Sequence, residues 1–328
     1  MITVSLYTKD DCSLCDQAQE DLSAIRKKIP YNLALVNVEE DADLKAAFAD
    51  RVPVLQVGPY TLEAPFDRQK IEMTLGAAQD RLRQVESDPK FKERKERGSR
   101  VSRGESAGVW FSRHYLAIVN LFLFLYVGLP FLAPVLMNAG YQGAARPIYT
   151  MYGAVCHQMA FRSWFLFGEQ PVYPRAAANV ESLTPYGEAT GLDEESLIEA
   201  RRFIGNEQLG YKVAFCQRDV AIYGSMLLFG LIYAASGRRI RSLHWVVWIA
   251  IGIGPIALDG FSQLFSQIPG FEFIPYREST PSLRTLTGSL FGFMTAWFGM
   301  PLLEETAAEN RVVIAAKKVR LSNDKKSG

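Results

Sequence analysis

Two of the chain's four cysteines, Cys12 and Cys15, are separated by two residues, which lets one thiol attack a disulfide and the other complete the exchange. An apolar, β-branched segment precedes them, and residues 13–27 carry apolar residues at helical spacing. The pair therefore lies at a strand-to-helix junction, where the helix dipole and free backbone N–H groups stabilise a thiolate. We expect Cys12 to attack and Cys15 to resolve the mixed disulfide by closing a Cys12–Cys15 bridge.

A Cys-x-x-Cys pair can also be half of a zinc site, which needs four ligands in total. Residues 1–86 contain no further cysteine and no histidine. A redox-active dithiol is therefore the better interpretation of this pair.

The elements that would hold the pair follow from the pattern of residues 1–86. Apolar runs predict strands at 2–7, 31–38 and 52–57 with a short partner at 61–62, and helical periodicity predicts helices at 13–27, 44–49 and 67–85. We expect Asp43 to cap the second helix. The order βαβαββα is that of an α/β thioredoxin fold.

Leu6–Lys9 before the cysteines and Arg51–Val54 after them resemble the glutaredoxin-like family of thioredoxin folds. The resemblance implies a cis Val52–Pro53 peptide facing the cysteines, where it presents backbone to a substrate. It also implies that the partner is a thiol- or disulfide-bearing protein, or glutathione.

Lys9 and Arg51 are the candidates for contact with a glutathione carboxylate. The sequence lacks the Thr-Gly-Gly-type turn by which members of that family hold glutathione. Glutathione is thus a candidate cofactor that the resemblance alone does not assign.

Residues 87–109 and 110–304 differ sharply in composition. Seven Lys and Arg residues stand between positions 90 and 103, with almost no apolar residues, so we expect a basic linker: Lys90, Lys92, Arg94, Lys95, Arg97, Arg100 and Arg103. Apolar segments at about 115–137, 219–237, 243–265 and 284–303 are long enough to span a bilayer. We expect residues 110–304 to form a membrane domain with four spanning helices.

Basic residues in the linker, in the 237–241 loop and in the tail at 305–328 predict that these segments lie in the cytosol. Residues 1–5 show no basic or apolar leader pattern, which favours a cytosolic N-terminal domain. The acidic 169–217 segment is then an outer loop. Because Arg162 interrupts residues 147–168, we expect an interfacial or re-entrant helix there. The sequence predicts a multi-pass protein of the cytoplasmic membrane.

This topology gathers a polar site at the outer ends of the spans. Its members are Cys156, His157, Gln158, Arg162, Cys216, Arg218, Asp219, Asp259, Gln263, Arg277 and Arg284, with Glu278 in the same segment. A carboxylate such as Asp259 in an otherwise apolar helix normally faces a partner or water.

Three interpretations of Cys156 and Cys216 remain open. They could form a disulfide in an oxidising exterior. They could bind a metal such as zinc with His157 and with Asp219 or Asp259, although neighbouring Cys and His side chains on a helix point about 100° apart. They could also be buried thiols beside a hydrogen-bonded His157.

The same region resembles an uncharacterised family of predicted prokaryotic membrane proteins. The matching blocks are Cys156-His157-Gln158 with Arg162-Ser163, Cys216-Gln217-Arg218, Asp259-Gly260 with Gln263, and Ser282-Leu283-Arg284 with Thr287-Gly288 and Phe291-Gly292. That family commonly has Cys-x-Arg-Cys where this chain has Asp219. The resemblance implies no activity.

The net charge of +1 argues against a nucleic-acid partner, and the apolar spans indicate a lipid membrane. We interpret the chain as a membrane-anchored thiol–disulfide oxidoreductase. Because the two cysteine pairs would face opposite sides of the membrane, exchange between them would need a carrier such as a quinone. The alternative is a transporter or metal-binding protein with an outward-facing polar site and a regulatory redox domain.

Overall fold

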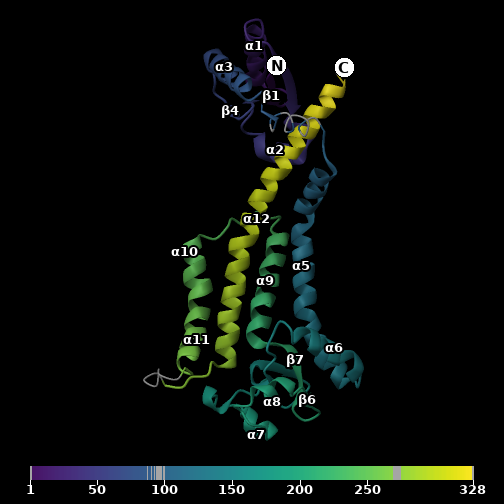
Figure 1. The fold of residues 1–328 in the computed structure, drawn as a ribbon, viewed down its shortest axis with the longest axis vertical. Coiled ribbons are helices and arrows are strands. Elements are labelled where there is room, and N and C mark those ends of the chain that lie inside the picture. Colours follow the sequence, from purple (N-terminus) through teal and green to yellow (C-terminus); the bar gives the residue numbers. More distant parts are fainter. Residues whose placement is uncertain are drawn as a thin grey trace. The chain divides into compact units, whose positions relative to one another are not determined.

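The computed structural model describes residues 2–86, 88–89, 91, 93, 98, 100–268 and 275–326. The chain divides into two compact units (Figure 1). The redox unit comprises residues 1–114 and 305–328, and the membrane unit comprises residues 115–304. Each unit is described by itself.

A four-stranded mixed sheet forms the centre of the redox unit. Its strands are β1 (Ile2–Thr8), β2 (Tyr31–Asn37), β3 (Val54–Val57) and β4 (Tyr60–Glu63), in the order β2-β1-β3-β4. β1 runs parallel to β2 and antiparallel to β3, which pairs with β4. The helices are α1 (Ser13–Ile25), α2 (Ala42–Phe48) and α3 (Arg68–Val85). The predicted βαβαββα order is confirmed.

Alternation along β1 places side chains on both faces of this sheet. Val4 and Leu6 pack with Leu22 of α1 and Leu75 of α3. On the other face, Tyr7 packs in a cluster with residues of helix α12 (Pro281–Lys326), whose C-terminal part belongs to the redox unit. The segment expected as a basic tail at 305–328 is therefore helical over its described residues and covers a sheet face.

The cap of α2 differs from the prediction. Asp41, which has an extended backbone, accepts the N–H groups of Asp43 and Leu44 at 2.8 and 3.4 Å, so the helix starts earlier than residue 44. Asp43 instead accepts hydrogen bonds from Arg311 at 3.1 Å and Arg113 at 2.9 Å.

The end of the expected linker is helical. Helix α5 (Arg103–Asn138) begins with a reciprocal capping box: Ser102 N–H donates to Glu105, and Glu105 N–H donates to the Ser102 hydroxyl. Five of the expected linker cations lie outside the described residues: Lys90, Lys92, Arg94, Lys95 and Arg97.

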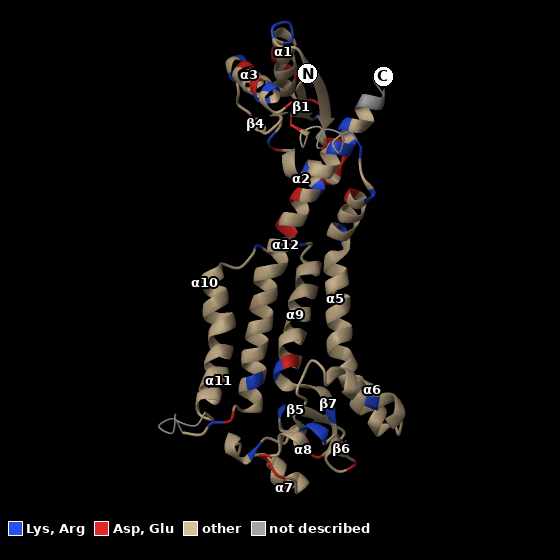
Figure 2. Cartoon of the chain, in the orientation of Figure 1, with Lys and Arg blue, Asp and Glu red and all other residues tan. Residues whose placement is uncertain are grey.

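Among the described residues, four helices are long and apolar enough to cross a membrane, as predicted. They are α5, α9 (Gln217–Ala235), the continuous helix Trp245–Phe265 and α12. The third combines α10 (Trp245–Val247), a π-helix (Trp248–Ile253) and α11 (Gly254–Phe265). Their apolar stretches are only 11% to 33% buried, and the middle of α9 carries no charge (Figure 2). The exposed apolar faces of these helices are suited to contact with lipid chains.

Close approach of α12 to α9 depends on Gly292. A Cβ at this position would lie 2.0 Å from the Ile222 carbonyl oxygen and 2.3 Å from the Ser225 hydroxyl, whereas one at Gly299 would meet nothing within 4 Å. We expect Gly292→Ala to lower the free energy of unfolding by about 1–3 kcal/mol through overpacking. Gly299→Ala is the matched control.

The measurement is denaturant unfolding of the detergent-solubilised chain followed by tryptophan fluorescence, since four of its five tryptophans lie within residues 115–304. Equal stability of Gly292→Ala and Gly299→Ala would contradict the observed packing.

Residues 147–168 are not one interfacial helix. Helix α6 (Gln142–Tyr152) ends at Gly153, a 3₁₀ turn covers Ala160–Arg162, and β5 (Ser163–Leu166) follows. Gln158 has a φ of +53°, which a right-handed helix does not permit. β5 pairs with β7 (Gly210–Cys216), which also pairs with β6 (Gly205–Asn206). The predicted loop at 169–217 thus contains β6 and β7, with α7 (Tyr186–Thr190) and α8 (Leu197–Arg202).

Candidate functional site

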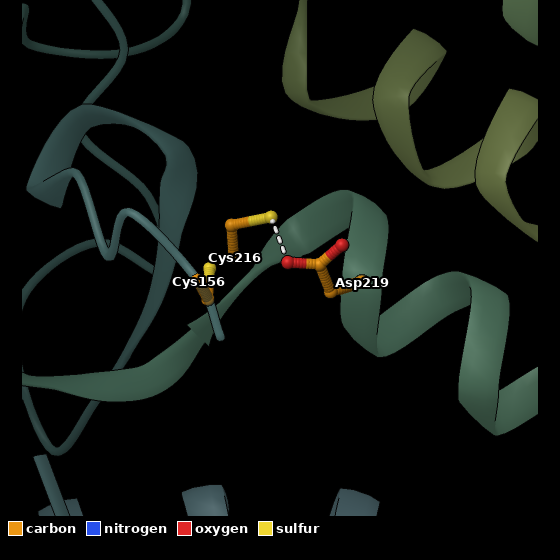
Figure 3. A group of neighbouring side chains, drawn as sticks. All are labelled: Cys156, Cys216 and Asp219. Carbon is orange, nitrogen blue, oxygen red and sulfur yellow. Dashed lines mark hydrogen bonds between the residues drawn. The ribbon is translucent and has the colours of Figure 1, made fainter. Parts of the chain in front are cut away.

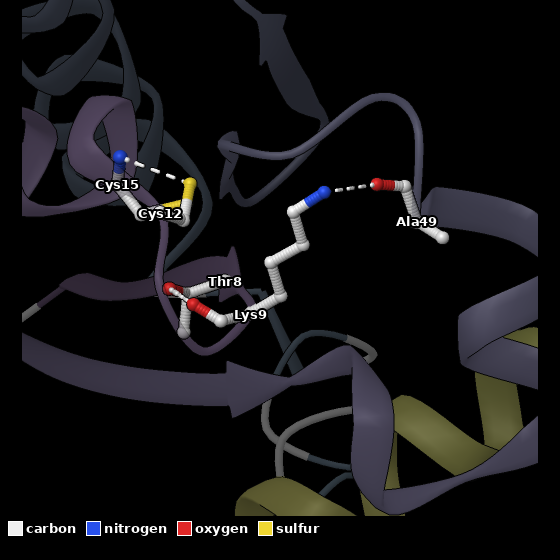
Figure 4. Close-up of a disulfide and its surroundings, with 5 residues drawn as sticks. All are labelled: Thr8, Lys9, Cys12, Cys15 and Ala49. Carbon is white, nitrogen blue, oxygen red and sulfur yellow. Dashed lines mark hydrogen bonds between the residues drawn. A yellow bond between two sulfur atoms is a disulfide. The ribbon is translucent and has the colours of Figure 1, made fainter.

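The Cys12–Cys15 pair lies at the start of α1 and is joined by a disulfide (Figure 4). Cys12 is the N-cap residue, and its sulfur accepts the backbone N–H of Cys15 at 3.3 Å. Cys12 is half-buried, whereas Cys15 is only 1% exposed. Cys12 is therefore the sulfur that a substrate can reach, and Cys15 is the sulfur behind it.

The cis proline that the resemblance implies is present in the same unit. The Val52–Pro53 peptide is cis, and Pro53 is buried directly before β3. The Lys9 ammonium donates to the Ala49 carbonyl at 3.1 Å (Figure 4). Arg51 forms an ion pair with Glu63. Both cations expected to meet glutathione thus have partners within the unit.

The predicted polar residues converge on one feature of the membrane unit, a cavity of about 710 Å³. Nine of the eleven line it: Cys156, His157, Gln158, Arg162, Cys216, Arg218, Asp219, Gln263 and Arg284. The other two, Asp259 and Arg277, pair with each other, and Asp259 also pairs with Arg218. The residues that the sequence analysis grouped therefore lie in or beside one cavity.

Two thiols and a carboxylate form one cluster in the polar cavity (Figure 3). The Cys156 sulfur, the Cys216 sulfur and an Asp219 carboxylate oxygen all lie within 4.8 Å of one another, and the Cys216 thiol donates to Asp219 at 2.9 Å. Both cysteines are free thiols. His157 is exposed and lies outside this cluster.

The two thiols have different acidities. The pKa of Cys216 is well above its ordinary value because its sulfur interacts with that of Cys156, because the group is buried, and because Asp219 is close. The same interaction with Cys216 lowers the pKa of Cys156. The contact between the two thiols therefore separates their pKa values.

Glu278 is the centre of an ion-pair network beside the cluster. Its side chain is 1% exposed and accepts from Arg162 at 3.0 Å, from Gln263 at 3.0 Å and from Arg284, while Arg175 lies 3.7 Å away. Charge-assisted hydrogen bonds from arginine side chains and an amide stabilise this buried carboxylate. Through Arg162, Gln263 and Arg284, the network connects the 3₁₀ turn Ala160–Arg162 with α11 and α12.

Asp259 forms a second network. Its carboxylate accepts from Arg277 at 2.8 Å, from the Ser279 hydroxyl at 2.8 Å and from Arg218. Asp259 is 4% exposed. Its three partners compensate the carboxylate charge, which the apolar side chains of its own helix cannot do. Asp259 therefore orients Arg218 at the cavity wall.

Gln158, which lines the cavity, and the buried Lys212 are both held by backbone carbonyl groups. The Gln158 amide donates to the carbonyls of Tyr149 at 2.9 Å and Ala214 at 2.8 Å, so its role is structural. The Lys212 ammonium is fully buried and donates to the carbonyls of Gln158 at 2.8 Å and Arg201 at 2.6 Å. Sequence reasoning missed Lys212, although it is the single charge in β7.

Arg175 was also missed. It is 5% exposed, lies against the Phe161 ring at 4.3 Å, and donates to the Tyr276 hydroxyl at 3.2 Å. It stands in an irregular loop, where no periodicity distinguishes a buried arginine from a solvated one.

Burial lowers the pKa of Lys212 to about 7, with Arg201 lowering it further and Cys156 opposing. At this position the unfolded chain therefore binds more protons than the folded chain between about pH 7 and pH 10.5, and the contribution of Lys212 to stability rises with pH in that window. We expect a slope of up to about 1.4 kcal/mol per pH unit. Lys212→Met should remove this slope.

The measurement is the free energy of unfolding against pH, by tryptophan fluorescence, with the exposed Lys45→Met as control. An unchanged slope in Lys212→Met would show that Lys212 does not titrate in this window.

Two family descriptions match separate parts of the chain. Residues 3–87 match "Glutaredoxin-like domain (DUF836)", and residues 203–298 match "Predicted membrane protein (DUF2085)". The second match contains Cys216, Arg218, Asp219 and the residues of both ion-pair networks on α11 and α12.

Individual proteins are similar as well. "Uncharacterized protein MJ1492" of Methanocaldococcus jannaschii is 25% identical over 202 residues, which cover 59% of this chain and 94% of that protein. The X-ray structure of Northeast Structural Genomics target protein XcR50 from X. campestris is 39% identical, covers 23% of this chain and 96% of that chain, and has a TM-score of 0.21. The chain thus carries a glutaredoxin-like domain at residues 3–87 and, at residues 203–298, a region of the predicted membrane protein family.

Proposed function

We propose that this protein is a membrane-attached thiol–disulfide oxidoreductase in which Cys12 and Cys15 carry two electrons. The observation that carries the proposal is the Cys12–Cys15 disulfide at the start of α1, with one sulfur accessible and the other buried in a glutaredoxin-like domain. The helix N-terminus stabilises the Cys12 thiolate in the reduced state.

The reaction proceeds in two exchanges. The Cys12 thiolate attacks a substrate disulfide, a bond forms between Cys12 and one substrate sulfur, and the other substrate sulfur leaves as a thiolate that takes a proton. The Cys15 thiolate then attacks Cys12, the Cys12–Cys15 disulfide forms, and the second substrate thiolate is released. A thiol or dithiol donor returns the pair to the reduced state.

The surroundings of Cys12 favour a protein substrate over glutathione. Leu14, between the cysteines, is 61% exposed and offers an apolar contact to a docking chain. Lys9 and Arg51 are engaged by Ala49 and Glu63, so a glutathione carboxylate would have to displace those partners. Val52 and the cis peptide to Pro53 would present backbone to the substrate.

The four apolar helices would attach this activity to the cytoplasmic membrane. The basic 237–241 loop supports a cytosolic position for the ends of α9 and α10 that it joins, and the N-terminal domain and the C-terminal segment would share that side. Thiol labelling with a membrane-impermeant reagent, in intact cells and in inverted vesicles, tests this sidedness. Labelling of reduced Cys12 from outside intact cells would contradict it.

The activity itself is tested with the full-length protein in detergent. The reduced protein should reduce a disulfide-bonded protein substrate faster than a glutathione mixed disulfide, and the Cys12–Cys15 disulfide should accumulate in step. A reduced protein that reduces neither the protein disulfide nor the glutathione mixed disulfide would contradict the proposal.

The polar cavity favours a second function, ligand or metal binding by the membrane unit with the redox unit as its regulator. Its charged lining includes Arg162, Arg218 and Arg284, and two buried carboxylates hold these groups in place. A cavity of about 710 Å³ is large enough for a small molecule. Purified protein with no bound ligand or metal, and no affinity for either, would contradict this second function.

A further inference from the structure

We propose that Cys156, Cys216 and Asp219 bind a thiophilic divalent cation, zinc being the ion that fits this donor set best. The proposal gives the second function above a specific ligand, and it is independent of electron transfer by Cys12 and Cys15. The three donor atoms lie within 4.8 Å of one another, so small side-chain movements would bring them around one ion.

Different elements hold the three donors. Cys156 follows α6 and is 7% exposed, within an apolar cluster that contains Ala214 and Phe215 of β7. Cys216 ends β7 where Ser163 of β5 pairs with it. Asp219 lies in the first turn of α9, three residues later, and accepts the Cys216 thiol (Figure 3). Because the sheet and the helix start fix these positions, little chain ordering is needed for binding.

The local charge suits such a centre. Two thiolates and one carboxylate around a divalent ion leave one negative charge, which a buried site must compensate. The cluster stands at the N-terminus of the 19-residue helix α9, whose dipole favours negative charge. Arg218 lines the same cavity, and the guanidinium groups of Arg162 and Arg284 share the single carboxylate of Glu278.

Three protein ligands leave a fourth position, as in catalytic zinc sites. All three donors line the polar cavity, so water or a small ligand can occupy that position. His157 also lines the cavity but is not within the cluster, which makes it a matched control rather than a ligand.

The experiment uses the full-length protein in detergent with Cys12→Ser and Cys15→Ser, because a reduced Cys-x-x-Cys pair could itself take up zinc. After incubation with zinc and desalting, we expect about one zinc per chain by elemental analysis. Cobalt should give a thiolate-to-cobalt charge-transfer band. Adding Cys216→Ser or Asp219→Asn should weaken zinc binding by about 100-fold or more, and adding His157→Ala should not.

A measurement without further substitution covers the case in which Cys216→Ser fails to fold. Zinc should slow the alkylation of Cys156 and Cys216 in the Cys12→Ser/Cys15→Ser protein. Alkylation that zinc does not slow, zinc binding that survives Asp219→Asn and Cys216→Ser, or a Cys156–Cys216 disulfide in protein taken directly from cells would each overturn the proposal. None of these outcomes bears on Cys12 and Cys15.

Discussion

Replacing Cys12 by serine is expected to lower the rate of disulfide reduction by the full-length protein by on the order of 10³ or more, since it removes the attacking thiolate. Replacing Cys15 by serine leaves that thiolate in place but removes the sulfur that resolves the mixed disulfide. Cys15→Ser should therefore accumulate a covalent adduct at Cys12, which is visible as a mass increase equal to one substrate thiol less its hydrogen and the hydrogen lost from Cys12.

The two variants control for each other because both exchange one sulfur for oxygen at the same helix start. The roles assigned to the pair follow from accessibility, since Cys15 is 1% exposed and Cys12 is half-buried. An adduct that forms on Cys15 in Cys12→Ser, but not on Cys12 in Cys15→Ser, would reverse the assigned roles.

The second large effect is expected at Glu278 in the membrane unit. Glu278→Gln keeps the shape of the side chain but removes the charge that Arg162, Arg284 and Arg175 share. Breaking a buried pair in this way typically costs about 3–5 kcal/mol. We expect a loss of that size in the free energy of unfolding, measured by tryptophan fluorescence in detergent.

Glu195→Gln is the matched control for this substitution. The Glu195 side chain is 75% exposed and lies 3.9 Å from Arg175, so its loss should change stability by less than about 1 kcal/mol. If Glu278→Gln and Glu195→Gln lowered the free energy of unfolding equally, burial would not determine how much the Glu278 network contributes to stability.

Local patterns in the sequence were sufficient to predict most of the strands and helices of the redox unit. The order of strands and helices depends on short-range periodicity, and the position of Cys12 depends on one strand-to-helix junction. The start of α2 was misplaced because Asp41 and Asp43 are both good cap residues. Only the backbone conformation at Asp41 decides between them.

The errors in the membrane unit have a long-range cause. Residues 160–166 were expected in a helix, but Ser163 pairs with Cys216, which is more than 50 positions away. No local pattern reports such pairing. Lys212 is buried because two carbonyls from other elements, those of Gln158 and Arg201, receive its ammonium group.

The grouping of the polar residues, by contrast, has a local signal in the sequence. Ionisable residues in apolar segments must find partners, so Asp259 required cations at the same depth. Arg218 and Arg277 fulfil that requirement. The sequence did not show which pairs form, so the hydrogen bond from Cys216 to Asp219 and the position of His157 outside the cluster are findings of the structure.

The most direct test of the redox proposal is an equilibrium titration of the full-length protein in glutathione buffers of increasing oxidised fraction, followed by alkylation and peptide mass spectrometry. We predict that Cys12 and Cys15 lose their thiols together, in one two-electron transition at about −200 to −270 mV. Thiols at Cys12 and Cys15 that oxidise independently, or that stay alkylated in every buffer, would contradict electron transfer by this pair.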